Sequence, residues 1–134
     1  MKYLVFFSLV MLVSCGKSLE QQNEELFDEV MKIHDEVMPE MGAIRKTRKA
    51  VLELQEASED STLRVQLLEV SNQLDEANEA MMNWMRNFEP DFQGTPEERK
   101  QYLDAEKKKM IEVRDMMLGS LQKGNDFLSA STDM

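Results

Sequence analysis

Apolar side chains recur at steps of three and four along three long stretches of this chain, the spacing that places them on one face of an α-helix. In the second stretch the steps alternate strictly between four and three. The positions are Leu63, Leu67, Val70, Leu74, Ala77, Met81, Trp84 and Phe88. This heptad seam predicts an amphipathic helix that packs its apolar side on other helices. No stretch shows the alternation of apolar and polar side chains that is typical of a β-strand.

The first helical stretch covers about residues 20–57 and contains a proline. Its apolar positions are Leu26, Val30, Ile33, Val37, Met41, Ile44, Val51 and Leu54. Pro39 lies inside this pattern, where a proline removes one hydrogen bond and crowds the carbonyl four residues earlier. Because Met38 would be a poor N-cap for a new helix and Gly42 is close by, we expect a kink in one helix.

Turn and capping signals separate the three stretches. The polar segment 58–61 is the turn candidate between the first and second stretches. Thr95 and Glu98 match a capping box, with Pro96 at the first helical position, so a third helix is expected to begin there. The expected helices are therefore about 20–57, 61–88 and 96–128.

Three long helices with two short connections predict an all-α fold, a three-helix antiparallel (up-down-up) bundle over residues 20–131. Each helix carries a second apolar row, which favours a closed core within one chain. The heptad seam also allows association with a second copy of the chain, so a homo-oligomer is an alternative prediction. Gly119 and Gly124 weaken the third pattern, and the residues from Ser129 onward are expected to fray.

The first 14 residues lie outside this pattern and read as a cleaved signal peptide. Lys2 precedes the apolar run Leu4–Val13, which has half of the roughly 20 residues that a membrane-spanning helix needs. The segment Leu12–Gly16 then resembles a bacterial lipobox, in which a lipid is attached to the cysteine and the chain is cut just before it. This resemblance implies a lipidated Cys15 and a short tether over residues 15–19. Gly16 stands where an aspartate would imply retention in the inner membrane, so an outer-membrane location is expected.

Charge limits the possible partners of the chain. The 134 residues hold 26 acidic and 16 basic side chains, a net charge of −10 that becomes −11 if Lys2 leaves with the signal peptide. This excess of negative charge disfavours nucleic acid as a partner, and it disfavours unaided binding to an anionic bilayer. The single cysteine excludes a disulfide within the chain.

Methionine is abundant, with 12 in the chain, and several share a helix face with the only histidine. If the second helix folds back at 58–61, His34 comes level with Trp84. The candidate ligands in this layer are Met31, His34, Met38, Met81 and Met85. Thioether and imidazole ligands suit Cu(I), so a soft-metal site is one interpretation. The other is core packing, since methionine fills irregular gaps and packs well on aromatic rings.

Motifs that would indicate an enzyme are missing from the sequence. It has no Gly-x-Ser-x-Gly turn, no phosphate-binding glycine loop and no zinc-ligand spacing. Acidic residues cluster in the first half of the first helix. A di-metal carboxylate bundle would need two Glu-x-x-His pairs, and Met31 stands three residues before the single histidine. The cluster is therefore interpreted as a solvated face, and the chain is predicted not to be an enzyme.

Two segments resemble the signature stretches of a known family. His34–Gly42 reads HDEVMPEMG and Ala80–Met85 reads AMMNWM. Both are similar to stretches in small helical lipoproteins of Bacteroidota, whose members often carry the label viral A-type inclusion protein. The resemblance extends over nearly the whole chain after the signal peptide. It implies a helical fold and an envelope location, and it implies no activity and no site residues.

Together these features predict a lipid-anchored helical-bundle protein of the bacterial outer membrane, facing the periplasm or the cell surface. It would act as a structural or interaction module, held at the membrane through Cys15 and meeting an unknown envelope protein. The alternative is a Cu(I)-binding lipoprotein that uses the methionine and histidine layer.

Overall fold

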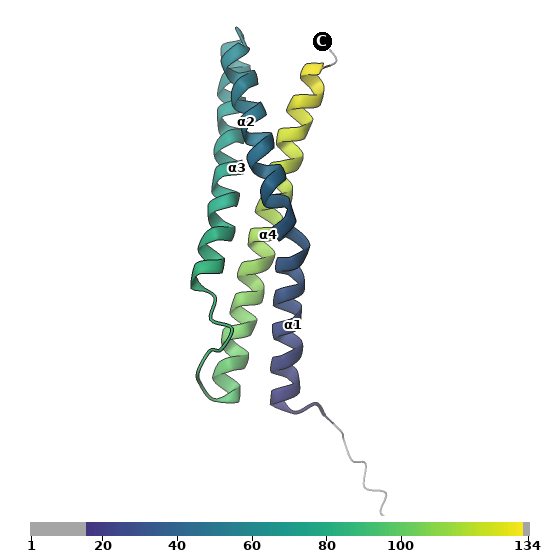
Figure 1. Ribbon diagram of the computed structural model, residues 1–134, viewed down its shortest axis with the longest axis vertical. Helices are drawn as coiled ribbons and strands as arrows, with labels where there is room; N and C mark the ends of the chain where they lie inside the picture. The colour runs from purple at the N-terminus through teal and green to yellow at the C-terminus, as the bar shows by residue number, and fades with distance from the viewer. Residues whose placement is uncertain (1–15, 133–134) are drawn as a thin grey trace, which may run out of the picture.

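The computed structural model describes residues 16–132, and the regular structure in that range is entirely helical (Figure 1). The elements in chain order are α1 (Leu19–Val37), the 3₁₀ turn η1 (Met38–Glu40), α2 (Met41–Ala57), α3 (Ser61–Asn87) and α4 (Pro96–Thr132). Because α1, η1 and α2 follow one another without a gap, they form a single long helical rod beside α3 and α4. The predicted all-α class with three helices is confirmed.

The interruption at Pro39 is a short 3₁₀ turn. Pro39 has no N–H to donate to the carbonyl four residues earlier, so the α-helical ladder cannot continue through it. The backbone tightens instead, and the N–H of Met41 donates to the carbonyl of Met38. No side chain caps the start of α2 at Glu40, as expected for a helix that resumes rather than begins.

Side-chain caps start the other helices. The Oδ1 of Asp60 accepts hydrogen bonds from the backbone N–H groups of Thr62 (2.8 Å) and Leu63 (3.2 Å) and so begins α3. At α4 the predicted capping box is present. The N–H of Thr95 donates to the Glu98 carboxylate at 2.8 Å, and the N–H of Glu98 donates to the Thr95 hydroxyl at 3.2 Å.

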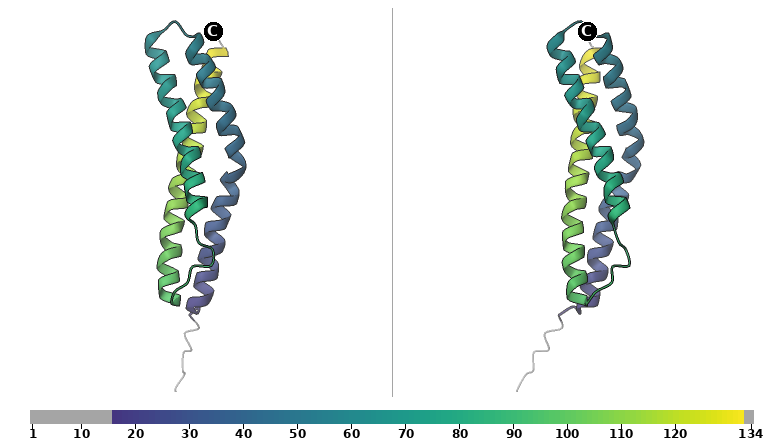
Figure 2. Two further views of the ribbon diagram at one scale, coloured as in Figure 1. Left: turned by 60° about the vertical axis from the view of Figure 1, so that its left-hand side comes forward. Right: turned by 90° about the vertical axis from the view of Figure 1, so that its left-hand side faces the viewer.

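The core runs along the length of the rods. In Figures 1 and 2, α1 lies beside the N-terminal half of α4, and α2 packs against both α3 and the C-terminal half of α4. The heptad positions of α3 from Leu67 to Trp84 are buried, which confirms that this seam faces the core. The other buried apolar side chains are Val30, Val37, Met41, Ile44, Val51, Leu103, Met110, Val113 and Met117.

Helix α4 extends to Thr132, beyond the end expected near residue 128. The expected fraying from Ser129 onward stays a prediction. Gly124 lies inside this helix, where α4 approaches α2 and α3 closely. A Cβ at Gly124 would come within 2.5 Å of Thr47 Cγ2 and 3.3 Å of Leu74 Cδ1. The glycine therefore permits close packing, and tertiary contact outweighs its low helix propensity.

Among the described helices, none combines the length and the apolar character that a membrane crossing requires. The predicted signal peptide and Cys15 fall in residues 1–15, outside the described range.

Candidate functional site

His34 and Trp84 lie next to each other in the structure, as predicted. Their ring centroids lie 5.5 Å apart, so folding α3 back at residues 58–60 brings the only histidine and the only tryptophan together. Nδ1 of His34 lies 2.8 Å from Oδ1 of the neighbouring Asp35. A ring nitrogen held by a carboxylate fixes the orientation of the imidazole.

The candidate methionine ligands differ in exposure. Met81 is completely buried, whereas Met31 and Met85 are partly buried and pack against the core. Met38 is 39% exposed, which places it at the edge of this layer. The described residues contain no group of three or more histidine, cysteine, aspartate or glutamate side chains that is arranged to hold a metal ion.

A row of stacked aromatic rings continues from Trp84 toward the connection between α3 and α4. Trp84 stacks on Phe88 with centroids 4.6 Å apart, and Phe88 in turn lies 6.1 Å from Phe27 and 6.2 Å from Tyr102. Phe92 then stacks on Tyr102 at 4.4 Å. We call these five side chains the aromatic row. It joins α1, α3, the connection and α4, so it fixes how the connection sits on the bundle.

Polar bonds hold this row in place on α4. The backbone N–H of Glu89 donates to the Tyr102 hydroxyl at 2.7 Å. Burial raises the pKa of Tyr102 above its ordinary value of 10.0. The bond from Glu89 lowers it, and the negative charge of Glu106 raises it further. The buried Glu106 pairs with Lys109 at 2.6 Å, and this bond raises the pKa of the Lys109 ammonium.

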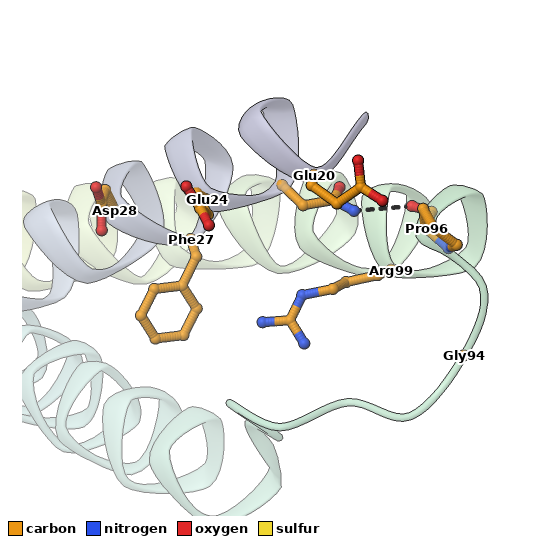
Figure 3. Close-up of a pocket in the computed structure, with 8 residues that line it drawn as sticks. Glu20, Glu24, Phe27, Asp28, Gly94, Pro96 and Arg99 are labelled. Atoms are coloured by element: carbon orange, nitrogen blue, oxygen red, sulfur yellow. Dashed lines mark hydrogen bonds between the residues drawn. The ribbon is translucent and has the colours of Figure 1, made fainter. Parts of the chain in front are cut away.

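A cavity of about 360 Å³ lies next to the aromatic row, between the start of α1, the connection and the start of α4. We call it the loop-end cavity. Its lining residues are Glu20, Asn23, Glu24, Phe27, Asp28, Gly94, Pro96 and Arg99. Figure 3 shows Phe27 and Arg99 reaching into the space between α1 and the connection that carries Gly94.

Two polar side chains organise the wall of this cavity. Asn23 is only 5% exposed, and its Nδ2 donates to the carbonyl of Pro96 at 2.9 Å, which ties α1 to α4. Its Oδ1 is buried without a hydrogen-bond partner among residues 16–132. Arg99 donates hydrogen bonds to the carbonyls of Phe92 (3.4 Å) and Pro90 (3.2 Å). These bonds tie the connection between α3 and α4 to the start of α4.

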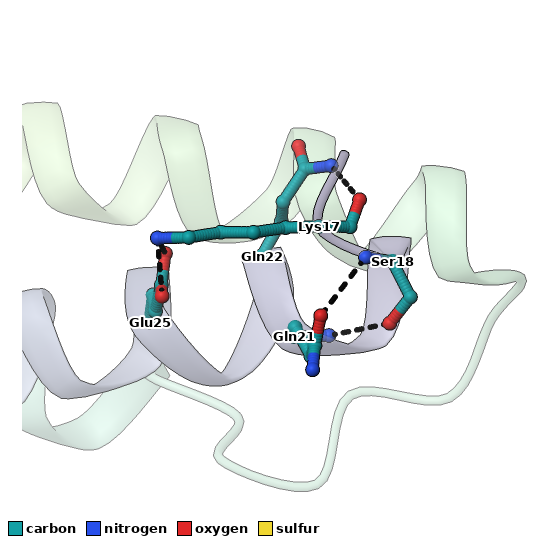
Figure 4. Close-up of polar contacts among 5 residues, drawn as sticks. All are labelled: Lys17, Ser18, Gln21, Gln22 and Glu25. Atoms are coloured by element: carbon teal, nitrogen blue, oxygen red, sulfur yellow. Dashed lines mark hydrogen bonds and ion pairs between the residues drawn. The ribbon is translucent and has the colours of Figure 1, made fainter. Parts of the chain in front are cut away.

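The chain enters the bundle at this same end. Ser18 and Gln21 form a capping box at the start of α1, and Lys17 pairs with Glu25 at 2.6 Å (Figure 4). Residues 17 and 18 therefore contact α1 directly. Most of the tether predicted over residues 15–19 is thus held against the helix. At most roughly 14 Å of extended chain separates Cys15 from Leu19.

The loop-end cavity was not predicted from the sequence. The acidic residues of the first helix were interpreted as a solvated face, and they are exposed, yet Glu20, Glu24 and Asp28 also border the cavity. Their spacing of four was the available signal, because it places all three on one helix face. Nothing in the pattern indicated that the connection would fold against that face.

The fold defines this chain as an all-α helical-bundle protein. No known protein family, curated protein sequence or solved structure matches it.

Proposed function

We propose that this protein is a non-enzymatic, lipid-anchored helical bundle of the bacterial outer membrane that acts as a structural or interaction module. The observation that carries the proposal is the position of the first helix. α1 begins at Leu19, four residues after the lipobox-like cysteine, and its first turn is fixed by Ser18 and Lys17. An acyl chain on Cys15 would therefore hold the bundle close to the bilayer.

The finer architecture belongs to the same proposal. The mature bundle would be up-down-up and antiparallel, after a signal peptide over residues 1–14. Two features support this arrangement: the short connection 58–60 between α2 and α3, and the packing of α4 against both α1 and α2. The anchored end would then carry the loop-end cavity, and the 58–60 turn would project away from the membrane.

The role as an interaction module draws on the charge and shape of the rods. With a net charge of −10, the helical faces suit a basic surface on another envelope component. Exposed apolar side chains on α3, Val65 (68%) and Leu68 (46%), offer a contact with that partner or with a second copy. Binding would be helped by the anchor, because it confines both components to one surface.

The anchor is tested with Cys15→Ser in the natural host. Metabolic labelling with a fatty-acid analogue should be lost, and the protein should move from the membrane to the soluble fraction. Ser14→Ala, which keeps the cysteine and a small residue before the cleavage point, is the control and should stay labelled. Unchanged labelling and unchanged membrane association of Cys15→Ser would refute the proposal. Cross-linking of the anchored protein in whole cells, compared with Cys15→Ser, then identifies the envelope partner.

A second candidate function, Cu(I) binding, is favoured by one observation. Nδ1 of His34 is bound by a carboxylate, and ligating histidines usually have this second interaction. The proposed ligands are Met31, His34, Met38, Met81 and Met85. Under reducing conditions, one Cu(I) per chain should quench Trp84 fluorescence, and His34→Ala should abolish the effect. Leu68→Ala, at an exposed position of α3 near the 58–60 turn, should leave the quenching unchanged. Absence of Cu(I) uptake excludes this candidate.

A further inference from the structure

We propose that the loop-end cavity binds a phosphoethanolamine group, which joins a primary ammonium to a phosphate, and that a membrane phospholipid headgroup supplies it. The choice of a lipid source rests on the proposed anchor at Cys15, which would place this cavity at the bilayer. The chemistry of the site itself does not depend on the anchor, because it follows from the lining residues.

Three carboxylates on one side of the cavity suit the ammonium. Glu20, Glu24 and Asp28 follow one another at steps of four along α1, so they form one acidic edge. None of them forms an ion pair with another side chain of residues 16–132, although neighbouring acidic residues such as Glu25 and Glu29 do. A cationic ligand would therefore not have to displace an existing partner. The ring of Phe27 adds an apolar wall on which an ammonium binds favourably.

Asn23 gives the cavity an unpartnered hydrogen-bond acceptor. Its amide nitrogen is occupied by the carbonyl of Pro96 at 2.9 Å, which fixes the side-chain orientation. The amide oxygen is buried and receives no hydrogen bond within the described residues. Such an atom needs an N–H or O–H donor, and a primary ammonium carries three N–H bonds whereas a quaternary ammonium carries none. A small shift of the cavity wall would let the ligand reach this oxygen.

Arg99 supplies the complementary site for an anion. A guanidinium has five N–H donors, and the bonds to the carbonyls of Phe92 and Pro90 leave others free for a phosphate oxygen. The positive and negative side chains of the cavity together favour a zwitterionic ligand. Arg99 would repel a simple cation, the three carboxylates would repel a simple anion, and a zwitterion satisfies both. A volume of about 360 Å³ accommodates a group of this size.

The charge of the whole chain favours the same lipid class. A protein with a net charge of −10 is repelled by anionic headgroups, whereas an ethanolamine phospholipid has no net charge. Headgroup binding would fix the tilt of the bundle relative to the membrane, since the acyl anchor alone leaves the rod free to pivot.

The first experiment tests the cavity without requiring the anchor. The full chain in maltoside micelles is titrated with soluble phosphoethanolamine by calorimetry, and we expect binding in the millimolar range. Phosphocholine, which lacks N–H donors, should bind at least fivefold more weakly. Glu24→Gln should weaken phosphoethanolamine binding at least fivefold. Glu36→Gln, which removes the same charge from an exposed position of the same helix outside the cavity, should leave it unchanged.

The second experiment tests the lipid source. The full chain is placed in phosphatidylcholine nanodiscs with or without phosphatidylethanolamine, and the side-chain amide resonance of Asn23 is followed by NMR. We expect this resonance to shift only when phosphatidylethanolamine is present, and the shift to be smaller in Glu24→Gln.

The outcomes separate three conclusions. Absence of phosphoethanolamine binding in micelles, or equal binding of phosphocholine, overturns the cavity as a zwitterion site. Binding of the soluble group with no response to phosphatidylethanolamine bilayers overturns the lipid source and leaves a free small molecule as the ligand. Neither result depends on the labelling of Cys15→Ser, so failure of the anchor proposal is recognised separately.

Discussion

The two ends of this bundle use the same helical repeat to build different interiors. At the loop end, the aromatic row and the loop-end cavity lie between α1, α4 and the connection. Toward the turn end, in the half of the bundle formed by α2, α3 and the C-terminal part of α4, Gly124 lets α4 approach Thr47 and Leu74 closely. Periodicity orients a helix, but the size of the side chains and the path of the connection decide whether an end is tightly packed or leaves room for a ligand.

The largest expected change in the free energy of unfolding is at the loop end. Trp84→Ala should lower the free energy of unfolding by about 3–5 kcal/mol, because it removes a large buried side chain and the stack with Phe88. Trp84→Phe should cost clearly less, since the indole N–H has no hydrogen-bond partner among the described residues and the ring contact is kept. Urea denaturation followed by circular dichroism measures both. Equal losses in the two variants would contradict this prediction, because they would show that a phenyl ring keeps none of the contact with Phe88.

The next largest change in stability is expected toward the turn end, where two glycines of α4 can be compared. Gly124→Ala should destabilise the protein by about 1–3 kcal/mol, because its Cβ would come within 2.5 Å of Thr47 Cγ2. Gly119→Ala should stabilise it by up to about 1 kcal/mol, since a Cβ there meets nothing within 4 Å and alanine is the better helix former. Thermal unfolding of the two variants, side by side, should give shifts of opposite sign. Shifts of the same sign would contradict close packing at this end.

The smallest effect depends on pH and belongs to the loop end. The pKa of Tyr102 is raised in the folded protein, so the folded state keeps a proton that the unfolded chain loses above its ordinary pKa of 10.0. Lys109 has a raised pKa as well, and its contribution is present below its ordinary value of 10.5 and lost as pH rises through the folded value. Stability should therefore fall as the pH rises above about 10.

Urea denaturation at a series of alkaline pH values measures this decline, and Tyr102→Phe should make it shallower. Most of the change should come from Tyr102, because the Lys109 side chain is 61% exposed and solvent screens its pair with Glu106. A stability that is constant or rising over this range would contradict the direction of both shifts.

Local signals in the sequence predicted much of the fold. The heptad positions of α3, the turn at 58–60 and the capping box at Thr95 are where the pattern placed them. The pairing of His34 with Trp84 followed from helix length and turn position alone. Helix α4 continues through Gly124 to Thr132, because glycine propensity is a weak term and the packing of Gly124 against α2 and α3 outweighs it.

Sequence patterns predicted much less of the candidate site than of the fold. The sequence drew attention to methionines, and the structure adds a cavity whose walls come from α1, the connection and α4. Arg99 and Asn23 are 76 positions apart in the numbering, and no periodic pattern relates them. Their meeting depends on how the connection folds back on the bundle.

By itself the sequence determined the helices, because the spacing of apolar residues, the proline and the caps act within a few residues of each other. It also carries the lipobox-like segment from which the proposed anchor at Cys15 derives. Only the tertiary structure decided which helix faces meet, how close Gly124 brings α4 to its neighbours and that Asn23 keeps an unpaired oxygen beside the cavity. The physical reason is that helix formation is local, whereas packing and burial depend on side chains brought together from distant parts of the chain.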